Sequence, residues 1–121
     1  MKSYTDIEQS KKLAEILPLE SADMEYIFLK ENNVAIGNIP FVKDDSEVEN
    51  SGFDCIYNRT PCWSLAALLS VLPEIQGGKP IIALDDNYIT YPHMSDLHTK
   101  ADNLVDACVA MIEKLNELKL L

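Results

Sequence analysis

The sequence predicts an α+β fold, a small antiparallel sheet packed with about three helices. Two patterns support this prediction. Apolar residues at offsets of three and four mark helices, chiefly a central Leu-rich helix near 61–72 and a C-terminal helix near 103–118. Alternating residues mark short strands, and their order along the chain is not that of alternating βαβ units. A length of 121 residues suits a single domain over 1–121.

The N-terminal helix is predicted from a capping signal and an apolar side. Thr5 can cap the first turn while Glu8, three residues later, bonds back to the backbone of Thr5 as a capping box. Pro18 should end the helix, because the residue before a proline is disfavoured in helical geometry. The apolar side consists of Ile7, Leu13, Ala14, Ile16 and Leu17.

Strands are expected next. Residues 24–30 alternate as a strand does, and Asn32-Asn33 suits a tight turn because asparagine tolerates a positive φ. Residues 34–36 can then return as a short partner strand. An acidic, polar stretch near 43–52 predicts an exposed loop, and a further strand is expected at 53–57.

The central helix has the clearest start signal. Thr60 is a good cap, and Pro61 at the first helical position loses no hydrogen bond there. Both faces of the segment are apolar or small, so we expect packing on two sides, up to a stop at Pro73.

The C-terminal part predicts a hairpin and a helix. Residues 81–84 and 88–91 suit two strands around Asp85-Asp86-Asn87. The last helix has Asn103 as its cap and Asp106 as a carboxylate in its first turn.

Acidity is the strongest compositional signal. Twenty Asp and Glu stand against ten Lys and Arg, a net charge of -10, and Arg59 is the one arginine. Nucleic-acid backbones and anionic membranes attract clustered cations, so direct binding to either is not expected. Residues 1–6 lack an apolar export segment, and the longest uncharged stretch, 60–73, is too short to span a bilayer. We therefore expect a cytoplasmic protein.

The cysteines predict neither a disulfide framework nor a zinc ribbon. Cys55, Cys62 and Cys108 are odd in number and form no Cys-x-x-Cys pair. Cys108 suits a core position. Cys62 alone has a mechanistic argument, because the first turn of a helix stabilises a thiolate, and His93 or His98 could act as its base.

Metal and cofactor chemistry has little support. Cys55, Cys62, His93 and His98 match no usual zinc spacing. Asp85-Asp86 with Asp96 could hold a hard cation, but acidic pairs are common in turns for local reasons. Gly77-Gly78-Lys79-Pro80 is not a phosphate-binding loop. We expect no cofactor, no metal and no catalytic residue.

Four residues are candidates for partner binding, with core packing as the alternative for each. Aromatic side chains are over-represented at binding hot spots. The candidates are Trp63, Tyr88, Tyr91 and His93.

Four segments carry a resemblance to a known set of proteins. They are residues 8–13, 21–24, 60–69 followed by Leu72-Pro73, and 102–107 followed by Met111-Ile112. Together they resemble an uncharacterised family of small proteins from Bacteroidales genomes and their prophages. The resemblance implies a mobile-element setting and no particular reaction.

The leading hypothesis is a non-enzymatic interaction or regulatory module, phage- or mobile-element-associated, that engages another protein through an aromatic patch beside the hairpin. One alternative is an acidic nucleic-acid mimic that acts on a DNA-binding protein, which the net charge of -10 suggests. The other alternative is a cysteine-dependent enzyme that uses Cys62. A homo-oligomer is left open.

Overall fold

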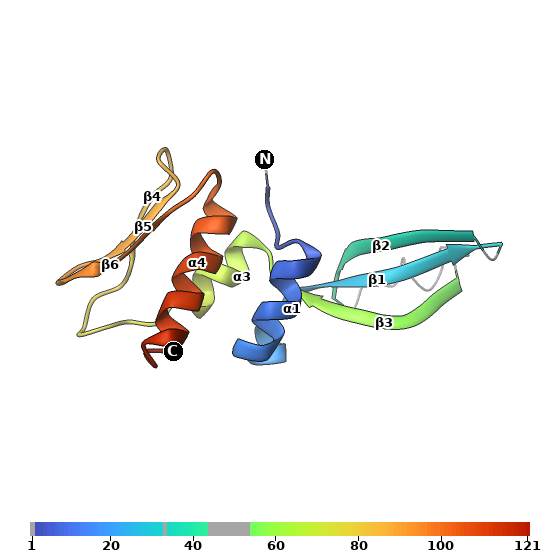
Figure 1. Ribbon diagram of the computed structural model, residues 1–121, viewed down its shortest axis with the longest axis horizontal. Coiled ribbons are helices and arrows are strands. Elements are labelled where there is room, and N and C mark those ends of the chain that lie inside the picture. The colour runs from blue at the N-terminus through green and yellow to red at the C-terminus, as the bar shows by residue number, and fades with distance from the viewer. Residues whose placement is uncertain (1, 33, 44–53) are drawn as a thin grey trace. The chain divides into compact units, whose positions relative to one another are not determined.

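The computed structural model describes residues 2–32, 34–43 and 54–121 (Figure 1). These residues form three α-helices and two antiparallel three-stranded sheets, which confirms the α+β prediction. The chain packs as two compact units. Asp6–Trp63 form the inserted unit, and Met1–Thr5 with Ser64–Leu121 form the terminal unit. That residues 1–121 make a single domain stays a prediction.

Helix α1 (Ile7–Ile16) opens the inserted unit. Its cap is Asp6, whose carboxylate accepts a hydrogen bond from the Gln9 backbone N–H at 2.8 Å, while Gln9 Oε1 accepts one from the Asp6 N–H at 3.1 Å. The predicted box of Thr5 and Glu8 is therefore wrong by one residue, because Asp6, with an extended backbone, is the last residue before the first helical turn and places Gln9 at the third helical position. The helix ends before Pro18, as predicted, and a 3₁₀ turn, η1 (Leu19–Ser21), follows.

The sheet of the inserted unit has the order β2-β1-β3. Its strands are β1 (Met24–Glu31), β2 (Val34–Val42) and β3 (Asp54–Cys62). Asn32 takes a φ of 51° after β1, as the turn prediction requires. Strand β2 runs well beyond the predicted residues 34–36. The predicted loop near 43–52 lies, apart from Lys43, outside the described residues.

The predicted helix near 61–72 is present, but it starts later. Thr60, Pro61 and Cys62 continue β3, paired with Tyr26, Glu25 and Met24 of β1. Because β3 is an edge strand, it tolerates a proline that has no N–H to donate. Ser64 then caps α3 (Leu65–Val71), its hydroxyl accepting a hydrogen bond from the Ala67 N–H at 3.2 Å. The prediction of Thr60 as the cap is wrong.

Strand β2 is the other edge of this sheet, and two features blunt it. Pro40 offers no N–H, and the pairing of β1 with β2 shifts register between Leu29 and Lys30. A proline and a bulge both disfavour the addition of another strand. The face of the sheet that carries Ile27 and Leu29 forms an apolar cluster with Ile39 and Phe41.

The terminal unit combines α3 with a second sheet and the C-terminal helix. The sheet has the order β4-β5-β6, from β4 (Ile81–Ala83), β5 (Tyr88–Tyr91) and β6 (Met94–Lys100). The hairpin of β4 and β5 confirms the prediction, whereas β6 was not predicted. Helix α4 (Leu104–Glu117) is capped by Asn103, whose side-chain oxygen accepts a hydrogen bond from the Asp106 N–H at 2.8 Å.

Helix α4 forms the core of the terminal unit, in contact with α3, β5 and β6. Eight of its residues are buried, namely Leu104, Val105, Ala107, Cys108, Val109, Met111, Ile112 and Leu115. Within the described ranges, no helix has the combination of length and apolar character that a bilayer crossing needs.

Candidate functional site

Two of the four predicted partner-binding residues are core residues. Trp63 is fully buried in the inserted unit, and its Nε1 donates a hydrogen bond to Ser21 Oγ at 3.0 Å. Tyr91 is 2% exposed in the terminal unit, and its hydroxyl donates to the carbonyl oxygen of Pro73 at 2.8 Å. Burial raises the pKa of Tyr91 to about 12. The prediction that Trp63 and Tyr91 belong to a contact surface is wrong, because both rings are buried and their polar atoms are hydrogen-bonded within the protein.

The other two predicted residues reach the surface. His93 is exposed in the turn between β5 and β6, where it takes a φ of 65°. Tyr88 is half-buried at the start of β5, and its ring lies 6.1 Å from the ring of His98, between centroids. Tyr88 and His93 thus stay candidates, and His98 joins them.

The β4-β5-β6 sheet has one packed face and one open face. Along β5, Ile89 and Tyr91 are buried while Tyr88 and Thr90 alternate with them, so the latter two point to the opposite side. On the packed side, the Thr99 hydroxyl of β6 donates a hydrogen bond to the Ala107 carbonyl of α4 at 2.8 Å.

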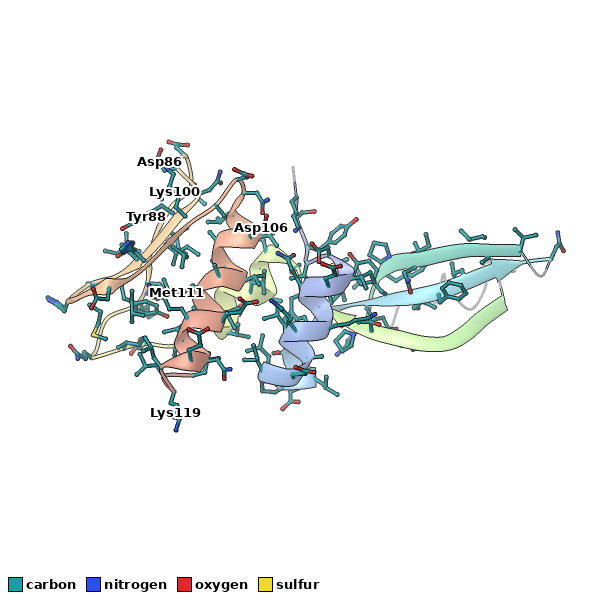
Figure 2. The ribbon with its side chains drawn as sticks, viewed as in Figure 1. Asp86, Tyr88, Lys100, Asp106, Met111 and Lys119 are labelled. Atoms are coloured by element: carbon teal, nitrogen blue, oxygen red, sulfur yellow. The ribbon has the colours of Figure 1, made fainter. Side chains whose placement is uncertain are left out.

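Strand pairing defines the open side, which we call the outer face. Thr90 pairs with Ile81 and His98, and Tyr88 pairs with Ala83 and Lys100, so two cross-strand rows lie on one side of the sheet. Figure 2 labels Tyr88 and Lys100 on this sheet and Met111 on α4. The outer face consists of Ile81, Ala83, Tyr88, Thr90, His98 and Lys100.

The outer face brings together two aliphatic, two aromatic, one hydroxyl and one cationic side chain. Ile81 is 56% exposed, and His98 and Lys100 are exposed as well.

Sequence reasoning missed the contribution of β6 to the outer face, although a signal was present. Leu97 and Thr99 alternate with the polar residues Asp96, His98 and Lys100, which is the period of a strand with one buried face.

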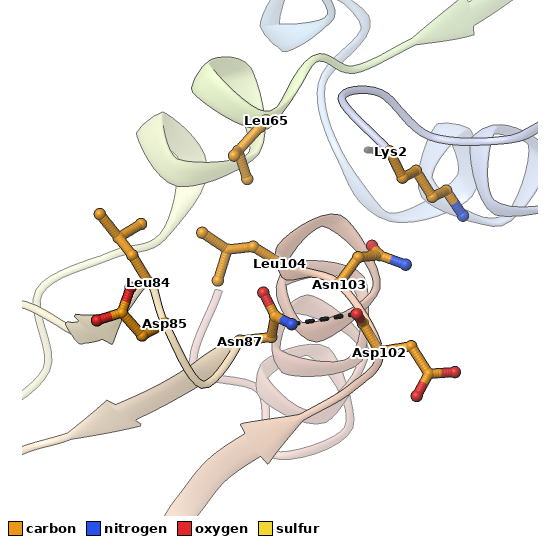
Figure 3. Close-up of a pocket in the computed structure, with 8 residues that line it drawn as sticks. All are labelled: Lys2, Leu65, Leu84, Asp85, Asn87, Asp102, Asn103 and Leu104. Carbon is orange, nitrogen blue, oxygen red and sulfur yellow. Dashed lines mark hydrogen bonds between the residues drawn. The ribbon is translucent and has the colours of Figure 1, made fainter.

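A pocket of about 490 Å³ opens in the terminal unit beside the β4–β5 turn (Figure 3). Leu65 of α3, Leu84 of the turn and Leu104 of α4 point their side chains toward a common space. The remaining lining is polar and consists of Lys2, Asp85, Asn87, Asp102 and Asn103. Sequence reasoning considered Asp85 only as a turn or cation residue and did not connect it with Leu84 or with the N-terminus.

The N-terminal segment reaches this pocket through bonds within the terminal unit. The Ser3 carbonyl accepts a hydrogen bond from the Leu65 N–H at 2.9 Å, and Tyr4 forms a β-bridge with Ser64. Lys2 Nζ lies 2.7 Å from Asp106 Oδ1. These contacts place Lys2 beside the start of α4.

Cysteine and metal chemistry find little support in the geometry. Cys62 is fully buried at the end of β3, so the helix N-terminus invoked to stabilise its thiolate is not there. Burial raises the pKa of the Cys108 thiol to about 12. Among the described residues, no three His, Cys, Asp or Glu side chains gather closely enough to hold a metal ion.

Comparisons with known proteins give no match: no family model, curated protein or solved structure matches this chain. The resemblance to the Bacteroidales and prophage family stays a prediction. The case for a function therefore depends on the outer face and the pocket.

Proposed function

We propose that this protein is a non-enzymatic interaction module that binds another protein through the outer face. One observation carries the proposal: Ile81, Tyr88, His98 and Lys100 gather on the open side of a sheet whose other side is packed. Tyrosine is enriched at protein interfaces and at their hot spots, which supports Tyr88 as an anchor of the contact.

The packed side supports this role because it holds the outer face in place. Ile89 of β5 and Leu97 of β6 are fully buried, and the Thr99 hydroxyl bonds the sheet to the α4 backbone. A surface that is already ordered loses less conformational entropy when a partner binds. The outer face is thus a preformed platform.

Charge disfavours a second copy of the chain as the partner. Two copies, each with a net charge of -10, repel each other. The edge strand β2 is also blunted by Pro40 and by its bulge, so it is a poor route to a dimer. As part of this proposal, the protein acts in the cytoplasm and is encoded by a phage or another mobile element.

The two alternatives from the sequence have less support. A nucleic-acid mimic needs carboxylates in rows spaced like phosphates, whereas the rows of the outer face hold Ile81, Tyr88 and Lys100. A cysteine-dependent enzyme needs an accessible thiol, whereas Cys62 is fully buried.

The test is photo-crosslinking in the host cell. A photoreactive phenylalanine analogue replaces Tyr88 in one variant and Asn116, an exposed residue of α4, in the matched control. We expect one discrete crosslinked protein from the Tyr88 position and none from the Asn116 position. No crosslink at Tyr88, or the same products from both positions, would contradict the proposal. A product of twice the chain mass would show a homo-oligomer and would also contradict it.

A further inference from the structure

The pocket beside the β4–β5 turn has an apolar floor that is open to solvent. Leu104 is 7% exposed, whereas Leu84 is 69% exposed. A leucine so exposed beside a concave surface gains from contact with a further apolar group, at roughly 25 cal/mol per Å² of area removed from water. The volume of about 490 Å³ falls in the range of ~300–1,000 Å³ common for ligand pockets.

Much of the polar rim is already bonded within the terminal unit. Asn87 Nδ2 donates a hydrogen bond to the Asp102 carbonyl at 3.1 Å, which ties the turn to the start of α4. Asn103 caps α4 and also donates from Nδ2 to Asp106 Oδ2 at 2.9 Å. The ammonium group of Lys2 is paired with Asp106. These bonds hold the rim in shape.

The carboxylates of Asp85 and Asp102 differ from the rest of the rim. Both residues are exposed at the pocket, and no cation among the described residues lies within ion-pair distance of either carboxylate. With Lys2 paired with Asp106, the pocket therefore has two carboxylates without an ion-pair partner among the described residues, that of Asp85 beside Leu84 and that of Asp102 at the start of α4, directed away from the leucines (Figure 3). A complementary occupant has an apolar side chain flanked by positive charge.

From this arrangement we infer that the pocket binds a segment of the partner protein in which an aliphatic side chain is flanked by Lys or Arg. The aliphatic side chain contacts Leu65, Leu84 and Leu104, and the long flanking cations reach the carboxylates of Asp85 and Asp102. This inference rests on the proposed protein-binding function and specifies the chemistry of its partner.

The probe is a fluorescein-labelled peptide, Gly-Lys-Leu-Arg-Gly, whose binding to the full chain is followed by fluorescence anisotropy. Asp85→Asn and Asp102→Asn should each weaken binding about two- to fivefold, which is the range of exposed ion pairs. The matched control is Asp86→Asn, an exposed neighbour in the same turn that does not line the pocket, and it should change the affinity less than each pocket variant.

The apolar half of the inference is tested separately. Leu84→Ser should weaken binding by at least about fourfold, which corresponds to one buried methylene. A peptide with Ser in place of Leu should show a similar loss, and a peptide with Glu in place of Lys and Arg should not bind. Circular dichroism confirms that each variant is folded.

Several outcomes would overturn the inference. They are equal effects of Asp86→Asn and the pocket variants, equal binding of the Ser and Leu peptides, and leucine amide binding as tightly as the peptide. The last result would show a site for a small cationic amphiphile. Crosslinks at Tyr88 without peptide binding would refute this pocket alone, and peptide binding without crosslinks at Tyr88 would refute the outer face alone.

Discussion

Replacing Tyr91 by phenylalanine tests the placement of this ring in the core. The change removes the hydroxyl that donates to the Pro73 carbonyl at 2.8 Å and keeps a ring that is 2% exposed. A neutral hydrogen bond contributes about 0.5–1.5 kcal/mol net, and a carbonyl left without its donor costs more. We expect Tyr91→Phe to lower the free energy of unfolding by about 1–2 kcal/mol at pH 7.

Alkaline pH should narrow the difference in free energy of unfolding between the wild type and Tyr91→Phe. Burial raises the pKa of Tyr91 from 10.0 to about 12, so above pH 10 the unfolded chain loses the phenol proton while the folded chain keeps it. The stability linked to the protonated phenol is fully present below pH 10 and is lost as the pH rises toward 12. At pH 11 the free energy of unfolding of the wild type has fallen by about 1 kcal/mol through this group, whereas the Phe variant lacks the phenol and does not lose this contribution.

Urea unfolding followed by far-ultraviolet circular dichroism measures both effects, because α4 lies in the same unit as Tyr91. Tyr88→Phe is the matched control on the same strand, and we expect no more than about 0.5 kcal/mol from this partly exposed residue at pH 7. If Tyr91→Phe is as stable as the wild type at pH 7, or if the gap widens between pH 9 and 11, the reasoning is refuted.

Three further predictions concern the terminal unit. Cys108→Ala should reduce the fall in melting temperature between pH 9 and 11, because the buried thiol has its pKa raised to about 12 and stabilises only while protonated; an unchanged pH profile would contradict this. Gly78→Ala should lower the free energy of unfolding by about 1–3 kcal/mol, because a Cβ there would lie 2.7 Å from Pro92 Cγ. A melting temperature equal to that of the wild type would contradict this. Asn103→Ala should lower the free energy of unfolding in urea by about 1 kcal/mol, because α4 loses its cap. Asn116→Ala should change it little, and equal effects of the two variants would refute the capping argument.

Local signals predicted much of the fold. The hairpin around Asp85-Asp86-Asn87, the Asn103 cap and the stop before Pro18 were all predicted, because turn and cap chemistry acts within a few residues. The start of the central helix was wrong because Thr60-Pro61 is also compatible with an edge strand. Pairing with β1, which lies far away in the sequence, decided between the two.

The candidate site was harder to predict, since it depends on which face of each element is covered. Aromatic composition selected Tyr88 and Tyr91 alike, yet the alternation of β5 buries Tyr91 and leaves Tyr88 on the open side. His98 joined the outer face only once β6 was known to pair with β5. The pocket is lined by both Lys2 and Leu104, which lie far apart in the sequence, so no local pattern reveals it.

The most direct test of protein binding through the outer face is the affinity of the crosslinked partner for a double variant. Ile81→Ala with Tyr88→Ala removes one exposed aliphatic and one aromatic group while the packed side of the sheet stays intact. We expect the Kd measured by isothermal titration calorimetry to rise about thirtyfold or more, which corresponds to 2 kcal/mol at a hot spot. A Kd within about twofold of the wild type would be smaller than the effect of an ordinary contact and would contradict the proposed function.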